Sequence, residues 1–518
     1  MDFMNAVKET ILEEYNTSVT ENGALGYATT GKELLDLNFA VASLRNASEN
    51  EIIERFKKAF YENKRLAIKW VFFARDVRGG LGERRLFRVI MRFLSEETPD
   101  AVIKLIPLFA EYGRWDDLIE MLKTVMCGDV RNSIIEYIGT QLYMDAQNAT
   151  HNKPITLLAK WMPSENASSA KTKVCARYLM KKLNISAKDY RSILSSLRKY
   201  IDVVERKMSA NKWNEINYES VPSKANLNYK DAFIKHDEQR RKEYLEKLAK
   251  GEAKINSSVL FPHEIVKRYR EMCGTKSYYD PHIKKLDSTL EEMWKALPNT
   301  VKGNDNTIVV ADGSGSMQCN IGGNTQALDV ANALAIYFAE HSSGVFKDKY
   351  ITFSNHPKFV DLSYGQTLKD KLNIAYGNDE CANTNIEAVF NLILTTALKN
   401  NLKQEELPKN ILIISDMEFD SATYGYNYAQ EKLFTTIAKN YEQCGYKLPR
   451  LVFWNVISRT NTIPVRENEN GVALVSGFST NICQMVMSNE TDPFKCLLNM
   501  LNSKRYDAVD GALKDIDI

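Results

Sequence analysis

The period of the hydrophobic pattern changes near residue 306, and this change limits the chain to a fold with two kinds of architecture. From about residue 48 to 210, apolar residues recur every three or four positions, which is typical of amphipathic helices joined by short connections. After residue 306, short β-branched and apolar runs alternate with helical patterns, as a mostly parallel sheet with helices on both faces requires. The sequence therefore predicts an α-helical part followed by a doubly wound, Rossmann-like α/β part.

The α/β part is expected to contain six strands and three amphipathic helices. The strands are predicted at residues 307–311, 350–353, 358–362, 410–415, 451–456 and 472–475, and the helices at about 325–342, 385–399 and 429–444.

With 518 residues the chain is long enough for two or three domains with sizeable cores. We expect a helical domain over residues 1–300, irregular and rich in charge at about 211–260. An α/β domain over 301–485 and a C-terminal helical extension over 486–518 follow it. No repeat of fixed length is visible in the helical domain, so a HEAT-like helical solenoid and a plain helical bundle both remain open.

Composition excludes several classes of protein. Hydrophobic residues make up 44% and charged residues 26% of the chain, which argues against extended disorder. No run approaches the roughly 18 apolar residues of a membrane span, and the first residues lack the apolar core of a signal peptide. The eight cysteines are scattered, with no CxxC pair. We therefore expect a cytoplasmic protein with reduced thiols and no membrane partner.

Oxygen-bearing side chains gather where the predicted strands end. The first strand runs into Asp312, Ser314 and Ser316, the fourth ends at Asp416, and Thr384 opens a helix. In an open α/β sheet the carboxyl ends of the central strands form the crevice where ligands bind, so these five side chains can converge. Two carboxylates with three hydroxyls suit a hard cation, and so few charged ligands favour Mg²⁺ or Mn²⁺ over Ca²⁺.

Simpler interpretations of the same residues stay open. Ser314 and Ser316 can cap the helix that follows them, and a site of this kind can be formed but idle. No glycine-rich phosphate-binding motif follows the first strand. Although Glu418 and Glu387 lie close to the site in sequence, neither is an obvious catalytic base, so we expect no enzymatic activity. Cys319 and Cys381 are expected to be free thiols.

Charge is distributed unevenly between the two parts. Residues 301–518 carry 19 Lys and Arg against 25 Asp and Glu, whereas residues 1–300 carry 49 against 41. Basic residues concentrate at 65–92 and 171–212, and such an excess can neutralise several phosphates of RNA or form ordinary solvated helix faces. The candidate RNA-binding residues are Arg75, Arg78, Arg84, Arg85, Arg88, Lys171, Lys173, Arg177, Lys181 and Lys182.

The chain resembles known families in both parts. The order D-x-S-x-S, Thr, Asp resembles the metal-ion-dependent adhesion site (MIDAS) of von Willebrand factor A domains. The segments at residues 22–27 and 74–80 and the basic helix at 173–182, with a C-terminal A domain, resemble the Ro autoantigen (TROVE) proteins. They are more similar still to an uncharacterised TROVE-like family of plants, bacteria and large viruses.

These resemblances imply a ring of HEAT-like repeats whose ends the A domain closes, with RNA held in or around a basic hole. By the same resemblance Ser314, Ser316 and Thr384 would contact the metal, and Asp312 and Asp416 would do so directly or through water. The sequence departs from the Ro family throughout the ring, so no individual RNA contact carries over.

The function that follows is a Ro-like, ribonucleoprotein-type scaffold that captures single-stranded or misfolded RNA, with a magnesium-binding A domain that closes the ring or recruits an acidic partner. The alternative is a metal-dependent module for protein–protein interaction or particle assembly, including assembly of a virus, without RNA. A metal-dependent hydrolase is the least favoured interpretation.

Overall fold

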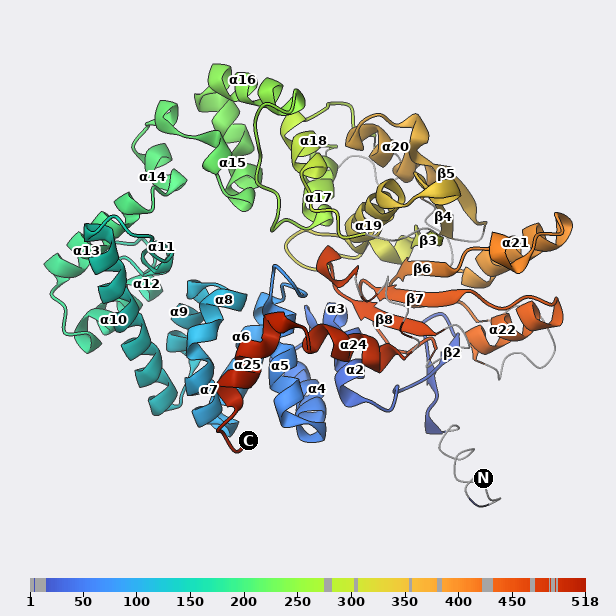
Figure 1. Ribbon diagram of the computed structural model, residues 1–518, viewed down its shortest axis with the longest axis horizontal. Coiled ribbons are helices and arrows are strands. Elements are labelled where there is room, and N and C mark those ends of the chain that lie inside the picture. The colour runs from blue at the N-terminus through green and yellow to red at the C-terminus, as the bar shows by residue number, and fades with distance from the viewer. Residues whose placement is uncertain are drawn as a thin grey trace. The chain divides into compact units, whose positions relative to one another are not determined.

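Figure 1 shows a computed structural model of the chain, which describes residues 4, 15–273, 282–301, 306–353, 356–379, 384–421, 432–465, 471–483, 485, 490 and 492–518. The chain divides into two compact units. Residues 1–51 and 257–500 form the first, called here the sheet unit, and residues 52–256 and 501–518 form the second, called the helical unit. These units do not follow the expected boundaries at residues 300 and 485, because the chain passes between them three times.

The sheet unit is built on one six-stranded sheet with the order β5-β4-β3-β6-β7-β8. Neighbouring strands are parallel except β4 and β5, which are antiparallel. The strands are β3 (Thr307–Asp312), β4 (Lys349–Phe353), β5 (Lys358–Asp361), β6 (Asn410–Ser415), β7 (Arg450–Asn455) and β8 (Val472–Ser476). All six predicted strands are therefore confirmed to within one residue at each end, and so is the mostly parallel sheet.

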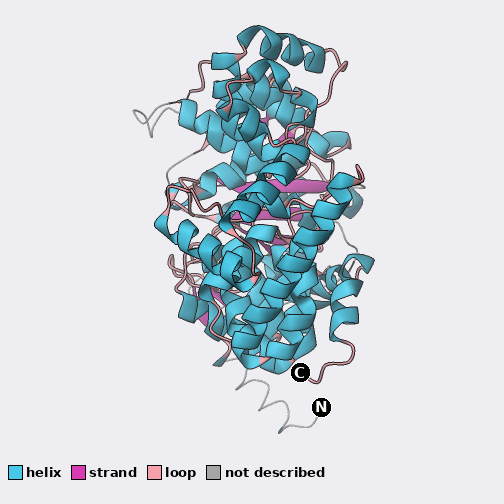
Figure 2. Ribbon diagram, turned by 90° about the vertical axis from the view of Figure 1, so that its left-hand side faces the viewer, coloured by secondary structure: helices cyan, strands magenta, loops and turns pink. Residues whose placement is uncertain are grey.

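Helices pack against this sheet on both faces (Figure 1), and Figure 2 distinguishes helices from strands by colour. The predicted helices correspond to α19 (Ala327–His341), α21 (Ile386–Lys399) and α22 (Leu433–Gln443). Further helices of this unit are α2 (Glu33–Phe39), α3 (Val41–Leu44), α17 (Pro262–Met272), α18 (Ser288–Lys295), α20 (Leu368–Asn378) and α24 (Pro493–Leu501). In α19 nearly every residue from Ala327 to Ala339 is buried, because it lies between the sheet and α17.

The first 51 residues are part of the sheet unit, and hydrogen bonds connect them to residues that are far away in the sequence. A short hairpin of β1 (Ser18–Val19) and β2 (Leu25–Gly26) leads to Tyr27, whose backbone exchanges two hydrogen bonds of 2.8 and 2.9 Å with Ile463. The Asn455 amide donates to the Phe39 carbonyl oxygen at 2.9 Å.

The helical unit confirms the helical periodicity of the first part of the sequence, since Ile52, Phe56 and Phe60 are all buried. Its helices vary in length from 4 to 23 residues, with no common repeat length among those described. They are α4 (Glu49–Glu62), α5 (Lys64–Arg75), α6 (Arg84–Glu97), α7 (Pro99–Leu105), α8 (Phe109–Tyr112), α9 (Trp115–Thr124), α10 (Gly128–Thr150), α11 (Leu158–Trp161), α12 (Ala170–Lys182), α13 (Ala187–Tyr200), α14 (Val204–Ser209), α15 (Ser223–His236), α16 (Glu238–Ala249) and α25 (Asp507–Leu513).

The segment at 211–260 is more regular than its charge pattern indicated. It contains α15 and α16, and Arg241 in its basic run is fully buried. The Arg241 guanidinium lies 4.9, 5.3 and 5.2 Å from the ring centres of Tyr218, Phe233 and Tyr244. The segment thus includes two regular helices, and one of its charged residues is a core residue that aromatic rings surround.

The C-terminal residues complete the helical unit at Asp76, just after α5. The buried Asp76 carboxylate accepts hydrogen bonds from the Arg505 guanidinium, at 2.8 Å for one nitrogen, and from the Tyr506 hydroxyl at 3.2 Å. The turn that follows needs glycine at Gly80, because a Cβ there would lie 1.9 Å from the Phe73 carbonyl oxygen. The segment at 74–80 thus has a structural role in receiving the C-terminal helix.

In the described part of the chain no helix is both long and apolar enough to cross a membrane. All seven cysteines described there are free, and Cys381 lies outside the described residues.

Replacing Asp76 with alanine is expected to lower the free energy of unfolding by about 3 kcal/mol, because it removes the carboxylate from a buried ion-pair network. Urea unfolding followed by circular dichroism measures this change. The control is Glu111→Ala, whose exposed carboxylate lies 3.7 Å from the same arginine and should contribute less than about 0.5 kcal/mol. Equal losses in both variants would show that the network is not a special contact.

Candidate functional site

Two buried carboxylates lie at the same edge of the sheet. Strands β3 and β6 are parallel neighbours in which Ala311 is opposite Ile414, so Asp312 and Asp416 come off adjacent strand ends. Their exposed fractions are 1% and 0%. The predicted convergence of the two aspartates at the carboxyl edge therefore holds in the structure.

The loop after β3 is organised by Asp312. One oxygen of its carboxylate accepts the Ser314 backbone N–H at 2.9 Å, and the other accepts the Ser415 hydroxyl at 2.7 Å. Gly313 is required in this loop, because a Cβ there would lie 2.9 Å from a carboxylate oxygen of Asp379. The hydroxyls of Ser314 and Ser316 lie 3.0 Å apart, and the Ser314 side chain makes no capping bond to the short helix that follows.

The chain turns sharply after β6. Met417 is buried with a φ of 63°, a left-handed conformation that costs a residue with a side chain free energy and is common at functional sites. This turn lets the Glu418 N–H donate to one oxygen of Asp416 at 3.1 Å. Among the described residues nothing donates a hydrogen bond to the other oxygen, Oδ2, and the Arg459 guanidinium forms an ion pair with it at 3.3 Å.

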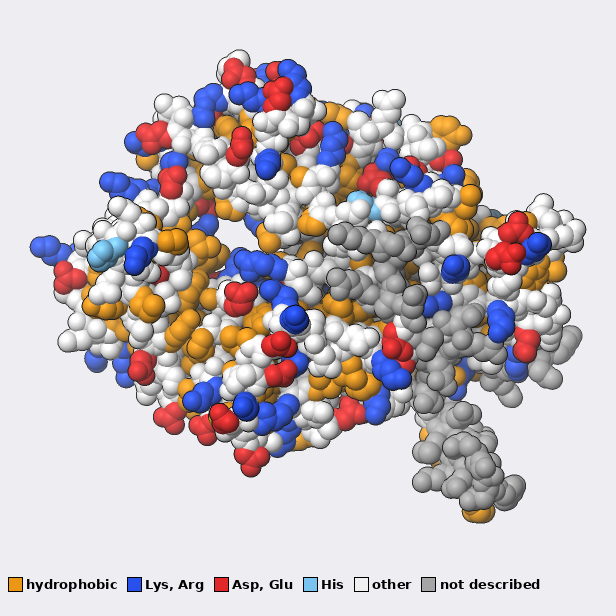
Figure 3. Space-filling model, viewed as in Figure 1, with side chains coloured by type: hydrophobic (Ala, Val, Ile, Leu, Met, Phe, Trp, Pro, Cys, Tyr) orange, Lys and Arg blue, Asp and Glu red, His pale blue; other side chains and the backbone are white. Residues whose placement is uncertain are grey.

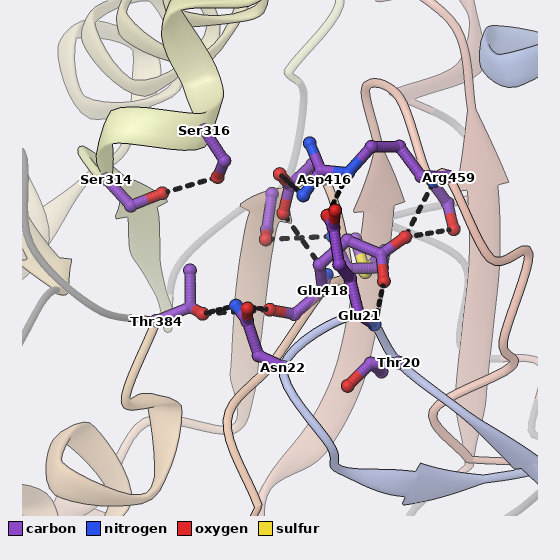
Figure 4. Close-up of polar contacts among 12 residues, drawn as sticks. Thr20, Glu21, Asn22, Ser314, Ser316, Thr384, Asp416, Glu418 and Arg459 are labelled. Atoms are coloured by element: carbon purple, nitrogen blue, oxygen red, sulfur yellow. Dashed lines mark hydrogen bonds and ion pairs between the residues drawn. The ribbon is translucent and has the colours of Figure 1, made fainter.

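Thr384 reaches the same region from the start of α21. Its hydroxyl lies 2.8 Å from the Glu418 carbonyl oxygen and 3.1 Å from a carboxylate oxygen of Asp420. The Asn22 amide donates to it at 2.6 Å. In Figure 4, Ser314, Ser316 and Thr384 lie on one side of Asp416, and Arg459 lies on the other.

Burial makes the two carboxylates difficult to ionise together. Burial, and then the nearby Asp416 charge, raise the pKa of Asp312 to about 7. Burial also raises the pKa of Asp416, although Ser316 and Arg459 oppose this rise. Burial therefore favours the protonated forms of both carboxyl groups as long as no cation lies between them.

These residues fit a hard divalent cation. Two carboxylates and three hydroxyls form an oxygen-only donor set, as Mg²⁺ and Mn²⁺ prefer, and one of the carboxylate oxygens, Oδ2 of Asp416, accepts no hydrogen bond from the described residues. The described residues include no cluster of three or more His, Cys, Asp or Glu that could hold a metal, so hydroxyls would have to complete the site. Burial and the nearby Asp416 raise the pKa of the Cys319 thiol, which disfavours a thiolate ligand.

Three residues near the site were not predicted as part of it. Asn22 and Arg459 come from segments far away in the sequence; the resemblance at residues 22–27 includes Asn22 but does not connect it with the site, and no local pattern marks Arg459. Glu418 was considered only as a possible base, but it is fully buried, and its carboxylate accepts hydrogen bonds from both loops beside the site. The other possible base, Glu387, is buried on α21.

The basic patch at 65–92 is largely neutralised within the helical unit. Arg75 is buried and its Nε donates to Asp117 at 2.9 Å, while Arg88 pairs with Asp116 and Asp117 at 2.9 and 2.7 Å. Arg78 donates to the Glu111 carbonyl oxygen at 3.2 Å. Arg84 and Arg85 are exposed on α6.

The second patch has a different character, because α12 has no acidic residue. Its buried residues are Cys175, Ala176, Leu179 and Met180, and its cations lie on the remaining face around the exposed Val174. In the described structure no ion pair or side-chain hydrogen bond involves these cations. They are Lys171, Lys173, Arg177, Lys181 and Lys182.

Comparisons with known proteins identify relatives of both parts. The family model "Domain of unknown function (DUF2828)" matches residues 20–145 and 139–306, which is more than half of the chain, and "Domain of unknown function (DUF7788)" matches 306–504. The "Uncharacterized protein L728" of Acanthamoeba polyphaga mimivirus is 28% identical over 522 residues, covering 94% of this chain and 87% of that protein. Among solved structures, the Ro (RSR) protein of Deinococcus radiodurans aligns with a TM-score of 0.37 and 12% identity, over 82% of this chain and 93% of its own.

The stability of the cation-free protein should depend on pH through Asp312. Because its pKa is raised to about 7, the folded state holds this proton more tightly than the unfolded chain does. The contribution of Asp312 to the free energy of unfolding should therefore fall as the pH rises from about 4 to about 7, by at most about 1.4 kcal/mol per pH unit. Denaturant unfolding in the presence of a chelator measures this slope.

Asp312→Asn should make the wild-type slope shallower by the contribution of one carboxyl group, while the part due to Asp379, whose pKa burial also raises to about 7, remains. Mg²⁺ at neutral pH should raise the melting temperature of the wild type but not of this variant. Asp361→Asn is the control, because Asp361 is only partly buried in the same unit and a Ser363 hydrogen bond lowers its pKa. An unchanged slope in Asp312→Asn would contradict the assignment of part of the titration to Asp312.

Proposed function

Because this chain belongs to the DUF2828 family, whose description assigns no activity, its function has to be inferred from its own side chains, and we propose that it is an RNA-binding scaffold with a divalent-cation site. In this proposal the helical unit binds the phosphates of single-stranded or misfolded RNA. The sheet unit holds Mg²⁺ or Mn²⁺ and binds an acidic partner.

The observation that carries the RNA proposal is the exposed face of α12. Five cations project from a helix of 13 residues that has no acidic side chain. Cations without a partner in the protein can neutralise RNA phosphates, and the release of the counterions condensed on the RNA is then a main driving force for association. In contrast, Arg75 and Arg88 already have carboxylate partners and would lose them on binding RNA.

The type of RNA follows from the shape and composition of this face. Val174 is 65% exposed at its centre, and Tyr178 is half-buried beside it. Apolar and aromatic surface between cations suits the unpaired bases of a single strand, which stack with little dependence on sequence. Figure 3 shows basic and acidic side chains interspersed over the visible surface, so net charge alone would not have located this face.

The cation site has a separate role in the proposal. Asp312, Ser314, Ser316, Thr384 and Asp416 would hold Mg²⁺ or Mn²⁺, which supplies a positive charge able to bind a carboxylate. The chain's own contribution is to orient the donors: Ser415 and the Ser314 backbone fix Asp312, and the Glu418 backbone fixes one oxygen of Asp416.

A protein-interaction module without RNA is the second candidate. The Asp416 oxygen that accepts no hydrogen bond from the described residues favours it, because a cation there could bridge this buried carboxylate to an acidic group of a partner. Catalysis is not part of either proposal, since Glu418 accepts hydrogen bonds with both carboxylate oxygens.

Reversal of charge on α12 tests the RNA proposal. Lys171, Arg177 and Lys181 are exposed and would be changed together to Glu. We expect weaker binding of a uridine-rich single strand, and a slope of log affinity against log salt that falls by about 2, since each lost phosphate contact removes about 0.7. Fluorescence anisotropy at several salt concentrations measures both quantities.

The matched control variant changes the net charge by the same amount, but at other positions of the helical unit. Lys207, Lys212 and Lys242 each pair with a carboxylate, and their reversal to Glu should alter RNA affinity much less. Equal losses in the two triple variants would mean that only the total charge matters. A wild-type protein that does not bind RNA at low salt would favour the protein-interaction module.

A further inference from the structure

A loop from the start of the chain lies directly on the cation site. In this loop, residues 20–22, the Thr20 hydroxyl donates to the Phe419 carbonyl oxygen at 2.6 Å. The Asn22 amide donates to the Thr384 hydroxyl at 2.6 Å and to the Glu418 carbonyl oxygen at 2.7 Å (Figure 4). One of the five predicted cation-binding side chains is thus held by a residue that lies more than 360 positions away in the sequence.

Glu418 fastens this loop to the end of β6. Its fully buried carboxylate accepts the Glu21 N–H at 2.8 Å, and it also accepts the N–H groups of Arg459 and Thr460 at 2.6 and 2.9 Å. The Ser458 hydroxyl donates to the same carboxylate at 3.1 Å. Glu418 therefore fixes two loops beside Asp416.

The Glu21 side chain shares one cation with Asp416. The Arg459 guanidinium forms an ion pair with Glu21 through Nε and approaches Asp416 Oδ2 to 3.3 Å with another nitrogen. Glu21 is 55% exposed, whereas Asp416 is fully buried. The partly exposed Arg459 guanidinium thus lies between the exposed Glu21 carboxylate and the buried Oδ2 of Asp416. This oxygen accepts no hydrogen bond from the described residues.

We propose that Glu21 is the built-in carboxylate ligand of the cation site. With Mg²⁺ or Mn²⁺ at Asp416, Arg459 would no longer be needed to neutralise this carboxylate, and the Glu21 carboxylate would turn from the guanidinium to the cation. The loop at residues 20–22 then occupies the position that an acidic partner would otherwise take. This inference rests on the proposed cation site.

Tethering makes Glu21 a strong competitor for that position. The Glu418 and Asn22 hydrogen bonds hold the loop in place, so Glu21 acts at the high effective concentration of an intramolecular ligand. A free acidic partner has to displace it, and this makes the loop a regulator of partner binding.

A double-mutant cycle separates ligation from a simple salt bridge, with Mn²⁺ titrated by calorimetry in each protein. Arg459→Gln should bind Mn²⁺ more tightly than wild type, because a competing positive charge is removed while the backbone N–H that holds Glu418 remains. Adding Glu21→Gln to that background should weaken binding by about tenfold if Glu21 is a ligand. If the double variant binds as Arg459→Gln does, Glu21 acts only on the arginine and the inference is wrong.

Hydrogen exchange supplies a readout that does not depend on affinity. Mn²⁺ should slow amide exchange in residues 20–27 of the wild type and of the control Glu33→Gln, but not in Glu21→Gln. Unchanged exchange in all three proteins, despite Mn²⁺ binding, would overturn the inference and leave the cation site intact. A wild type that binds no Mn²⁺ would overturn the cation site as well.

Discussion

The closeness of two buried carboxylates is the constraint on which the rest of the site depends. Asp312 and Asp416 leave adjacent parallel strands at the same edge, and neither is exposed to water that could solvate its charge. The neighbouring features all reduce this cost. Ser415 and the Ser314 backbone donate to Asp312, the left-handed turn at Met417 brings a backbone N–H to Asp416, and Arg459 supplies a positive charge.

The sequence predicted what depends on local pattern. Continuous apolar runs placed all six strands of the sheet, and the order of Asp312, Thr384 and Asp416 placed them at one edge, because parallel strands have their carboxyl ends together. Asn22 and Arg459 could not be predicted in the same way. Their contacts join segments hundreds of residues apart, and such pairings leave no periodicity in either segment.

Charge was the least predictable property, because a cation in a sequence does not show whether it has a partner. Arg75 and Lys171 belong to similar basic segments, yet the first is buried on Asp117 and the second is exposed without an ion pair in the described structure. Arg241, in a segment expected to be irregular, is surrounded by aromatic rings. The helices themselves were predictable. Tertiary packing decides which of their charged faces stay available to a ligand, and the sequence pattern does not show this.

The order in which the chain passes between its two units has a consequence for synthesis on the ribosome. Residues 52–256 emerge before the segment that carries Arg505 and Tyr506, so Asp76 stays without these partners until translation has passed residue 500. The first 51 residues likewise wait for later segments, since the Phe39 carbonyl oxygen is bonded by Asn455 of β7 and the Tyr27 backbone by Ile463. Both units thus mature late and nearly together, and a nascent chain of intermediate length exposes unfinished surfaces of each, which makes it a natural client for chaperones.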